Sequence, residues 1–323
     1  MPEQAFDAQD CALSVRGLTK VMGKKKILDN ISFQTQKGEV FGFLGPNGAG
    51  KTTTIKIICG LLYADEGAIS IDGFDTEKQF EKAIGGIGAI VENPEMYHKL
   101  TGLENLRQYA RIRDGITKAR IDEVVELVGL KNRIHDKVGK YSLGMRQRLG
   151  VAQAILHRPS VLILDEPTNG LDPAGIKELR DILKHLAHDE GVSVMVSSHL
   201  MSEMELMCDR VGIIVRGVMR SVQTVEEMIA SASGTEVCFV LRVSDAAAAL
   251  AALPEALRSA ATVPDGFHLE FTLPKADADA QICAVNSAIV RGGVALYTVA
   301  HKENKRLEDV FIELTNSGGD QIA

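Results

Sequence analysis

One short stretch of this chain constrains its fold more than any other, because it joins an apolar run to a helical pattern through a glycine-rich loop. The run Val40–Leu44 predicts a buried strand, and residues 51–59 predict a helix that ends at Gly60. The loop between them fits the pattern G-x-x-x-x-G-K-[ST]: Gly45, Pro46, Asn47, Gly48, Ala49, Gly50, Lys51, Thr52 and Thr53. The stretch therefore predicts an α/β fold that binds a nucleoside triphosphate.

The chemistry of this loop follows from its residue types. Its glycines let backbone N–H groups and the helix N-terminus face phosphate oxygens, while Lys51 bridges the β- and γ-phosphates. The Thr52 hydroxyl is placed to reach a bound Mg²⁺. The alternative is an ordinary glycine-rich turn between a strand and a helix, which the strand-loop-helix setting disfavours.

A second apolar run ends in two consecutive carboxylates. The run Val161–Asp165, followed by Glu166, is typical of a strand buried in a parallel sheet whose carboxyl end faces a ligand. We expect Asp165 to hold the Mg²⁺ and Glu166 to polarise the water that attacks the γ-phosphate.

A third motif lies just before that run, where Ser142 is the expected N-cap of a helix that continues to about His157. A capping hydroxyl, free N–H groups and a helix dipole can also bind an anion, so a phosphate contact is an equally physical interpretation. Both roles stay open from the residues alone.

These three motifs together resemble the ATP-binding subunit of an ABC transporter, over about residues 10–220. The resemblance implies a nucleotide-binding domain of that type, with a mixed sheet core and a helical subdomain, and ATP and Mg²⁺ as its ligands. The signature of the family aligns with Ser142, Leu143, Gly144 and Met145, in which the serine and second glycine are kept. Asp172 falls in the loop that follows the catalytic carboxylate, and His199 aligns with the switch histidine that bonds the γ-phosphate.

The same resemblance implies partners and a location. In this family the signature of one subunit closes on ATP held by the other, so we expect a homodimer or heterodimer of ATPase subunits. An integral membrane permease completes the transporter, and the chain is expected in the cytoplasm, on the inner face of the cell membrane. A soluble ABC ATPase that acts on a ribosome or a regulatory complex is the alternative.

Two departures from the family pattern carry further information. Glu92 stands where a glutamine usually joins the core to the helical subdomain, and it retains the ability to bind Mg²⁺ or water. Met22 stands where an aromatic side chain normally stacks on adenine. The segments around Glu92 and Ser142 are similar to those of the bacitracin and lantibiotic resistance branch, which implies export of peptide antibiotics.

Composition fits an enzyme that relies on a separate membrane subunit. The chain has 323 residues, 45% of them hydrophobic, but has no apolar run long enough to span a bilayer. Residues 1–5 lack the features of a signal peptide. A net charge of −7 gives no footprint for nucleic acid. We interpret the basic run Lys24, Lys25 and Lys26 as a solvated hairpin turn, with a lipid-binding or phosphate-binding patch as the alternative. The five scattered cysteines fit reduced thiols.

The pattern of signals also predicts the organisation of the chain. Residues 10–221 form the expected ATPase domain, with its helical subdomain at about 93–157. Residues 222–323 form a small α+β accessory domain. Its predicted order is β-α-β-β-α-β, which suggests a ferredoxin-like unit, and residues 306–315 resemble a terminal helix of this transporter group.

Overall fold

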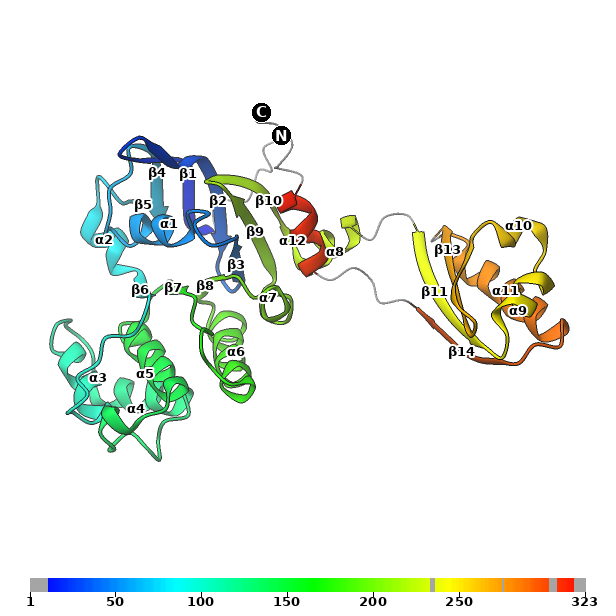
Figure 1. The fold of residues 1–323 in the computed structure, drawn as a ribbon. Coiled ribbons are helices and arrows are strands. Elements are labelled where there is room, and N and C mark those ends of the chain that lie inside the picture. Colours follow the sequence, from blue (N-terminus) through cyan, green and yellow to red (C-terminus); the bar gives the residue numbers. More distant parts are fainter. Residues whose placement is uncertain (1–10, 233–235, 275, 302–306, 317–323) are drawn as a thin grey trace. The chain divides into compact units, whose positions relative to one another are not determined.

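The computed structural model describes residues 11–232, 236–274, 276–301 and 307–316 (Figure 1). Residues 1–5, expected not to be a signal peptide, and Arg306, where the terminal helix was expected to begin, lie outside them. The chain divides into two compact units, Met1–Val225 and Glu226–Ala323. Within the described ranges, no helix is both long enough and apolar enough to cross a membrane.

A mixed six-stranded sheet forms the centre of the first unit. Its spatial order is β10-β9-β3-β8-β7-β6, and every neighbouring pair is parallel except β10 with β9. The strands are β3 (Val40–Leu44), β6 (Ile87–Ile90), β7 (Val161–Asp165), β8 (Ser193–Ser198), β9 (Arg210–Val215) and β10 (Val218–Thr224). Strands β3, β7 and β8 are buried at every residue, which explains why β3 and β7 are nearly continuous apolar runs.

An antiparallel sheet of order β2-β1-β4-β5 lies beside it in the same unit. Its strands are β1 (Cys11–Met22), β2 (Lys25–Gln36), β4 (Glu66–Ile71) and β5 (Phe74–Asp75). Buried side chains of both sheets and of helix α1 (Lys51–Ile58) form one core. The ring of Phe33 stacks on Phe41 and Phe43, with centroids 5.5 and 5.2 Å apart, and so ties the two sheets together.

The chain between β6 and β7 is helical, and its main helices gather in one lobe (Figure 1). They are α3 (Gly102–Ala110), α4 (Lys118–Leu127), the short 3₁₀ helix η1 (Val138–Lys140) and α5 (Leu143–Ile155). Helix α3 starts with a complete capping box, in which Thr101 accepts from the Glu104 backbone and Glu104 accepts from the Thr101 backbone. These two hydrogen bonds satisfy backbone groups in the first turn of α3 and so fix where the helix begins.

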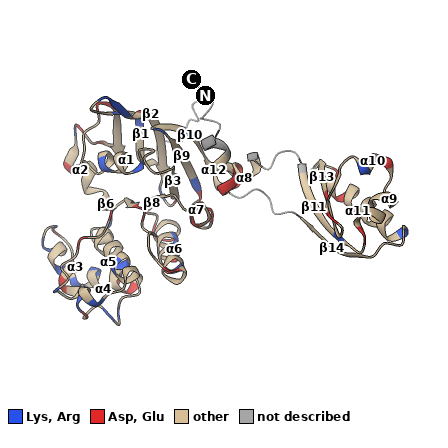
Figure 2. Ribbon diagram, in the orientation of Figure 1, with Lys and Arg blue, Asp and Glu red and all other residues tan. Residues whose placement is uncertain are grey.

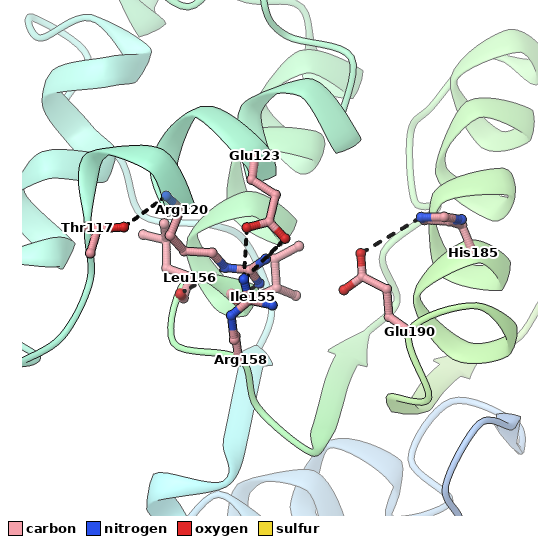
Figure 3. A network of polar contacts seen from close by, with 8 residues as sticks. All are labelled: Thr117, Arg120, Glu123, Ile155, Leu156, Arg158, His185 and Glu190. Carbon is pink, nitrogen blue, oxygen red and sulfur yellow. Dashed lines mark hydrogen bonds and ion pairs between the residues drawn. The ribbon is translucent and has the colours of Figure 1, made fainter.

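A buried arginine fastens α4 to the end of α5 (Figure 3). The Arg120 guanidinium donates to the carbonyl oxygens of Ile155 at 2.7 Å and Leu156 at 3.2 Å, and to Glu123 at 2.7 Å. Carbonyls at the end of a helix lack intrahelical partners, and Arg120 supplies one for each of these two. The Ile155 carbonyl also accepts from the Arg158 backbone N–H at 3.1 Å. Helix α5 ends at Ile155, slightly before the predicted end near His157.

The remaining helices of the first part of the chain pack on its two sheets or follow them. They are α2 (Phe80–Gly85), α6 (Pro173–His188) and α7 (Met201–Met207), while α8 (Val225–Ala232) spans the division between the two units. Helix α2 contacts β4 and β5 of the antiparallel sheet, α6 contacts β3 and β8, and α7 contacts β3. The apolar face of α6 is buried, as shown by Leu179, Leu183 and Leu186.

The second unit contains a four-stranded antiparallel sheet with helices packed on its core face. Its elements are β11 (Glu236–Val243), α9 (Ala246–Ala252), α10 (Glu255–Arg258), β12 (Ala261–Asp265), β13 (His268–Pro274), α11 (Ala278–Arg291), β14 (Leu296–His301) and α12 (Leu307–Asn316). The spatial order β12-β13-β11-β14, with helices after the first and third strands, is the ferredoxin-like arrangement that the sequence suggested. The short helix α10 was not expected.

Candidate nucleotide-binding site

The glycine-rich loop connects β3 to α1, as the sequence predicts. Gly50, the last residue before the helix, has a φ of 111°, and a Cβ there would lie 2.6 Å from a methyl carbon of Leu28. Only glycine fits this backbone at that distance. Lys51 is buried in the first turn, and its ammonium donates to the Gly45 carbonyl oxygen at 2.7 Å.

Asp165 ends strand β7 and is held by two hydroxyl groups. It is 3% exposed. Its Oδ2 accepts from Thr52 Oγ1 at 2.8 Å, and its Oδ1 accepts from Ser197 Oγ at 2.5 Å. Thr52 comes from the phosphate loop and Ser197 from β8, so three segments far apart in the chain meet at one carboxylate. Ser197 was not among the predicted site residues, because nothing in its local sequence distinguishes it from other strand serines.

Glu166 turns away from the strand into a different environment. Its φ of 50° lies in the left-handed region, which is uncommon for a residue with a side chain, and its backbone N–H donates to Ser197 Oγ at 3.0 Å. Its carboxylate lies 3.4 Å from the Lys51 ammonium and 2.7 Å from His199 Nδ1. The strained turn thus brings Glu166, Lys51 and His199 together.

These groups surround a cavity of about 430 Å³. The predicted residues that line it are Pro46, Asn47, Gly48, Gly50, Lys51, Thr52, Thr53, Glu166 and His199. Lys25, Ile27 and Asn169 line it as well. None of these three was predicted to bind the nucleotide, although Lys25 belongs to the basic run just after Met22.

Met22 and Glu92 lie outside that lining. Met22 is the last residue of β1, is 44% exposed and pairs with Lys25 across the hairpin. Glu92 follows β6 with a φ of 69°, and its carboxylate lies 2.8 Å from the ammonium of Lys56 on α1. The hydrogen bond from Lys56, and then its charge, hold the pKa of Glu92 below its usual value.

The signature residues lie at the start of α5. Ser142 is the N-cap, and its hydroxyl accepts from the Met145 backbone at 3.2 Å. Leu143 packs beside Gly170, where an added Cβ would lie 3.0 Å from a Leu143 methyl carbon. The signature turn therefore touches the loop that leads to Asp172.

Asp172 is the N-cap of α6, where it accepts from the Gly175 backbone at 3.0 Å. Asp172 does not line the cavity of its own chain. The same holds for the four signature residues, Ser142, Leu143, Gly144 and Met145.

The Asp165 cluster fits a magnesium ion chemically. Its oxygens come from a carboxylate and from the hydroxyl groups of Thr52 and Ser197, and hard cations such as Mg²⁺ prefer oxygen ligands. A nearly buried carboxylate at the end of a strand, beside a phosphate-binding loop, is also where a metal bound to phosphate would lie.

Comparison with known proteins gives a consistent picture. Residues 28–169 match the family model described as ABC transporter. The chain is 47% identical to an uncharacterised ABC transporter ATP-binding protein, YhcH of Bacillus subtilis, over 96% of this chain and 98% of that protein. It is 35% identical to the bacitracin transport ATP-binding protein BcrA of Enterococcus faecalis, over 95% of this chain and 97% of that one.

A solved ATP-binding subunit of an ABC transporter has the same fold over the first part of the chain. It superposes with a TM-score of 0.61 at 30% identity, and the match covers 68% of this chain and 92% of that structure. The fold, the phosphate loop and the relatives agree with the resemblance seen in the motifs. This chain belongs to the ATP-binding proteins of ABC transporters.

Proposed function

We propose that this chain hydrolyses Mg-ATP with the residues around its cavity, as a dimer, to power a membrane exporter of bacitracin-like or lantibiotic-like peptides. The proposal of ATP hydrolysis rests on one observation: Lys51, Glu166 and His199 line the same cavity. Glu166 lies 3.4 Å from Lys51 and 2.7 Å from His199. The family hydrolyses ATP to drive transport, and this geometry supplies groups for that reaction.

The roles follow from charge and position. Lys51 and the N-terminus of α1 stabilise the charge on the phosphates. Glu166 accepts a proton from the attacking water, and its position at the cavity wall gives it access to that water. His199 bonds to Glu166 in this structure, so it can orient the carboxylate and contact the γ-phosphate.

Mg²⁺ would be held by Asp165 and the Thr52 hydroxyl, with Ser197 fixing the carboxylate. When bound, the ion neutralises charge on the β- and γ-phosphates. We assign Ser197 a positioning role, because its hydroxyl bonds both Asp165 and the Glu166 backbone.

The dimer is supported by residues that lie away from their own cavity. Ser142 and Gly144 do not line it, so their contact with a nucleotide requires a second subunit. Asp172 is near the signature through the packing of Leu143 on Gly170, which fits a continuous subunit interface. Whether the second subunit is a copy or a relative does not alter this role.

The substrate class is supported by the bacitracin transport protein, whose similarity extends through the C-terminal unit. We place the chain at the cytoplasmic face of the membrane, bound to a permease. The relatives are named for transport, and this favours a membrane partner over the alternative of a ribosome or regulatory complex.

Antibiotic susceptibility tests the proposal. The chain would be expressed with the membrane protein encoded beside it in a sensitive strain, and growth inhibition measured with bacitracin, a lantibiotic and an unrelated antibiotic. We expect resistance to the peptides alone, its loss in Glu166→Gln, and its retention in Glu81→Gln, a change at an exposed residue of α2. Equal sensitivity with the wild-type chain and with Glu166→Gln would refute the substrate assignment.

A further inference from the structure

One cation in the nucleotide cavity has no role in the function described so far. Lys25 is the first residue of β2 and lines the same cavity as the phosphate loop. Its neighbour two residues along, Ile27, lines it too, as expected for alternate residues that share one face of a strand. The interpretation of residues 24–26 as a wholly solvated turn is therefore incomplete.

The hairpin gives the three lysines different surroundings. A two-residue loop joins β1 to β2, with Gly23 at a φ of 61°, and this turn pairs Met22 with Lys25. Lys24 lies in the loop, outside the cavity lining. Lys26 forms an ion pair with Asp29 at 2.9 Å. Within the part of the chain that the structure describes, no carboxylate lies within ion-pair distance of Lys25.

The charges around the cavity indicate what Lys25 would bind. Lys51 lies close to Glu166, so a carboxylate partly offsets its charge, and Asp165 adds a second negative charge behind Thr52. A triphosphate is itself strongly anionic. An exposed cation that faces this cavity without an acidic partner is therefore attracted to the phosphate chain.

We propose that Lys25 is a nucleotide-binding residue that contacts the phosphate chain and thereby strengthens binding where Met22 replaces a stacking aromatic. This inference rests on the proposed ATPase function. Lys25 acts by charge, so it holds ATP and GTP alike. Its role is in binding and not in the hydrolytic step, which Glu166 performs.

The test uses the full chain and two matched variants, Lys25→Met and Lys24→Met. Each removes one charge from the same hairpin and keeps a long, unbranched side chain. Dissociation constants for Mg-ATP, Mg-ADP and Mg-GTP would be measured in the Glu166→Gln background, where hydrolysis does not disturb the titration. Lys25→Arg, which retains the charge, completes the set.

We expect Lys25→Met to weaken binding of all three nucleotides roughly three- to twentyfold, the range between an exposed ion pair and a hydrogen bond to a charged group. Lys24→Met should bind like the parent, and Lys25→Arg should recover most of the loss. Because salt screens charge, the affinity of Lys25→Met should depend less on ionic strength than that of the parent. In the background with Glu166 intact, KM for ATP should rise while kcat is retained.

Three results would overturn the inference. One is equal affinity of Lys25→Met and Lys24→Met for nucleotide. Another is a loss confined to ATP, which would mean contact with the base instead of the phosphates. The third is a loss with an unchanged salt dependence. Failure of the parent chain to bind any nucleotide would instead refute the proposed function, so the two failures are distinguishable.

Discussion

Two consecutive carboxylates acquire different surroundings because the backbone changes conformation between them. Asp165 completes the buried strand β7 and accepts hydrogen bonds from Thr52 and Ser197. Glu166 adopts a left-handed φ of 50°, which points its side chain at the cavity. Such backbone strain is found where a functional side chain must be presented. One residue is thereby suited to hold a cation and the next to meet water.

We expect Glu166→Gln to keep nucleotide binding and to lower turnover by roughly 10²–10⁴, the usual loss when a general base is removed. The amide preserves the size of the side chain but cannot accept the proton. Phosphate release at saturating Mg-ATP measures the effect, with Glu81→Gln as a control on exposed α2. Turnover close to that of wild type would show that Glu166 is not the base.

At the scale of elements, four helices of the first unit begin with a capping side chain, and two of these caps coincide with functional motifs. Thr101, Thr117, Ser142 and Asp172 each accept a backbone hydrogen bond at a helix start. The same exposed N–H groups that need a cap can bind phosphate, which is why structure and function share these positions. The connection from β6 into the helical lobe is different, because it starts at Glu92, which bonds Lys56 of α1.

The Glu92–Lys56 pair links that connection to the phosphate-binding helix, so we expect it to couple the nucleotide site to the membrane subunit. Glu92→Gln and Lys56→Met should keep ATPase activity near the wild-type rate but lose peptide resistance in cells with the full transporter. Glu95→Gln, an exposed charge nearby, is the control. A fall in hydrolysis with a higher Mg²⁺ requirement would instead place Glu92 at the metal, as the sequence also allowed.

The dimer can be tested at the start of α5. With the Glu166→Gln chain, Mg-ATP should drive dimerisation, and Ser142→Arg should block it because a long cation would occupy the space of the phosphate contact. Light scattering with and without Mg-ATP measures this. Thr117→Arg removes a cap of the same kind from α4 and should leave dimerisation intact. A monomer under all conditions would contradict the shared site.

At the scale of the whole molecule, the two units have separate hydrophobic cores. The core of the first unit is formed by buried side chains of α1 and of both sheets. The core of the second unit lies between its antiparallel sheet and helices α9 and α11. Both units carry acidic as well as basic residues (Figure 2). Each unit therefore has the core that independent stability requires.

This separation predicts local effects of core mutations. Phe271 is fully buried in the second cluster, so Phe271→Ala should destabilise that unit by about 3–5 kcal/mol. The transition that ATP stabilises should keep its melting temperature, because ATP binds the first unit. Thermal unfolding with and without Mg-ATP measures both, and Val263→Ala on an exposed position is the control. A shift in the ATP-stabilised transition would show that the units unfold together.

The sequence alone determined the motifs and most elements of this protein. The strand Val40–Leu44, the phosphate loop, the helix that follows it and the N-cap at Ser142 were all predicted from neighbouring residues. The ferredoxin-like order was also predicted, because alternating strand and helix patterns are local. Hydrophobic periodicity, glycine and capping residues act within a few positions along the chain, so they can be recognised without a structure.

The tertiary structure alone decided which distant side chains meet. Ser197 bonds Asp165, Glu92 pairs with Lys56, and Lys25 faces the cavity, and none of these contacts follows from local sequence. They depend on the order and register of strands, since a shift of one residue moves a side chain to the opposite face of the sheet. Motifs therefore identify the chemistry from sequence, whereas the packing of sheets and helices determines which residues support it.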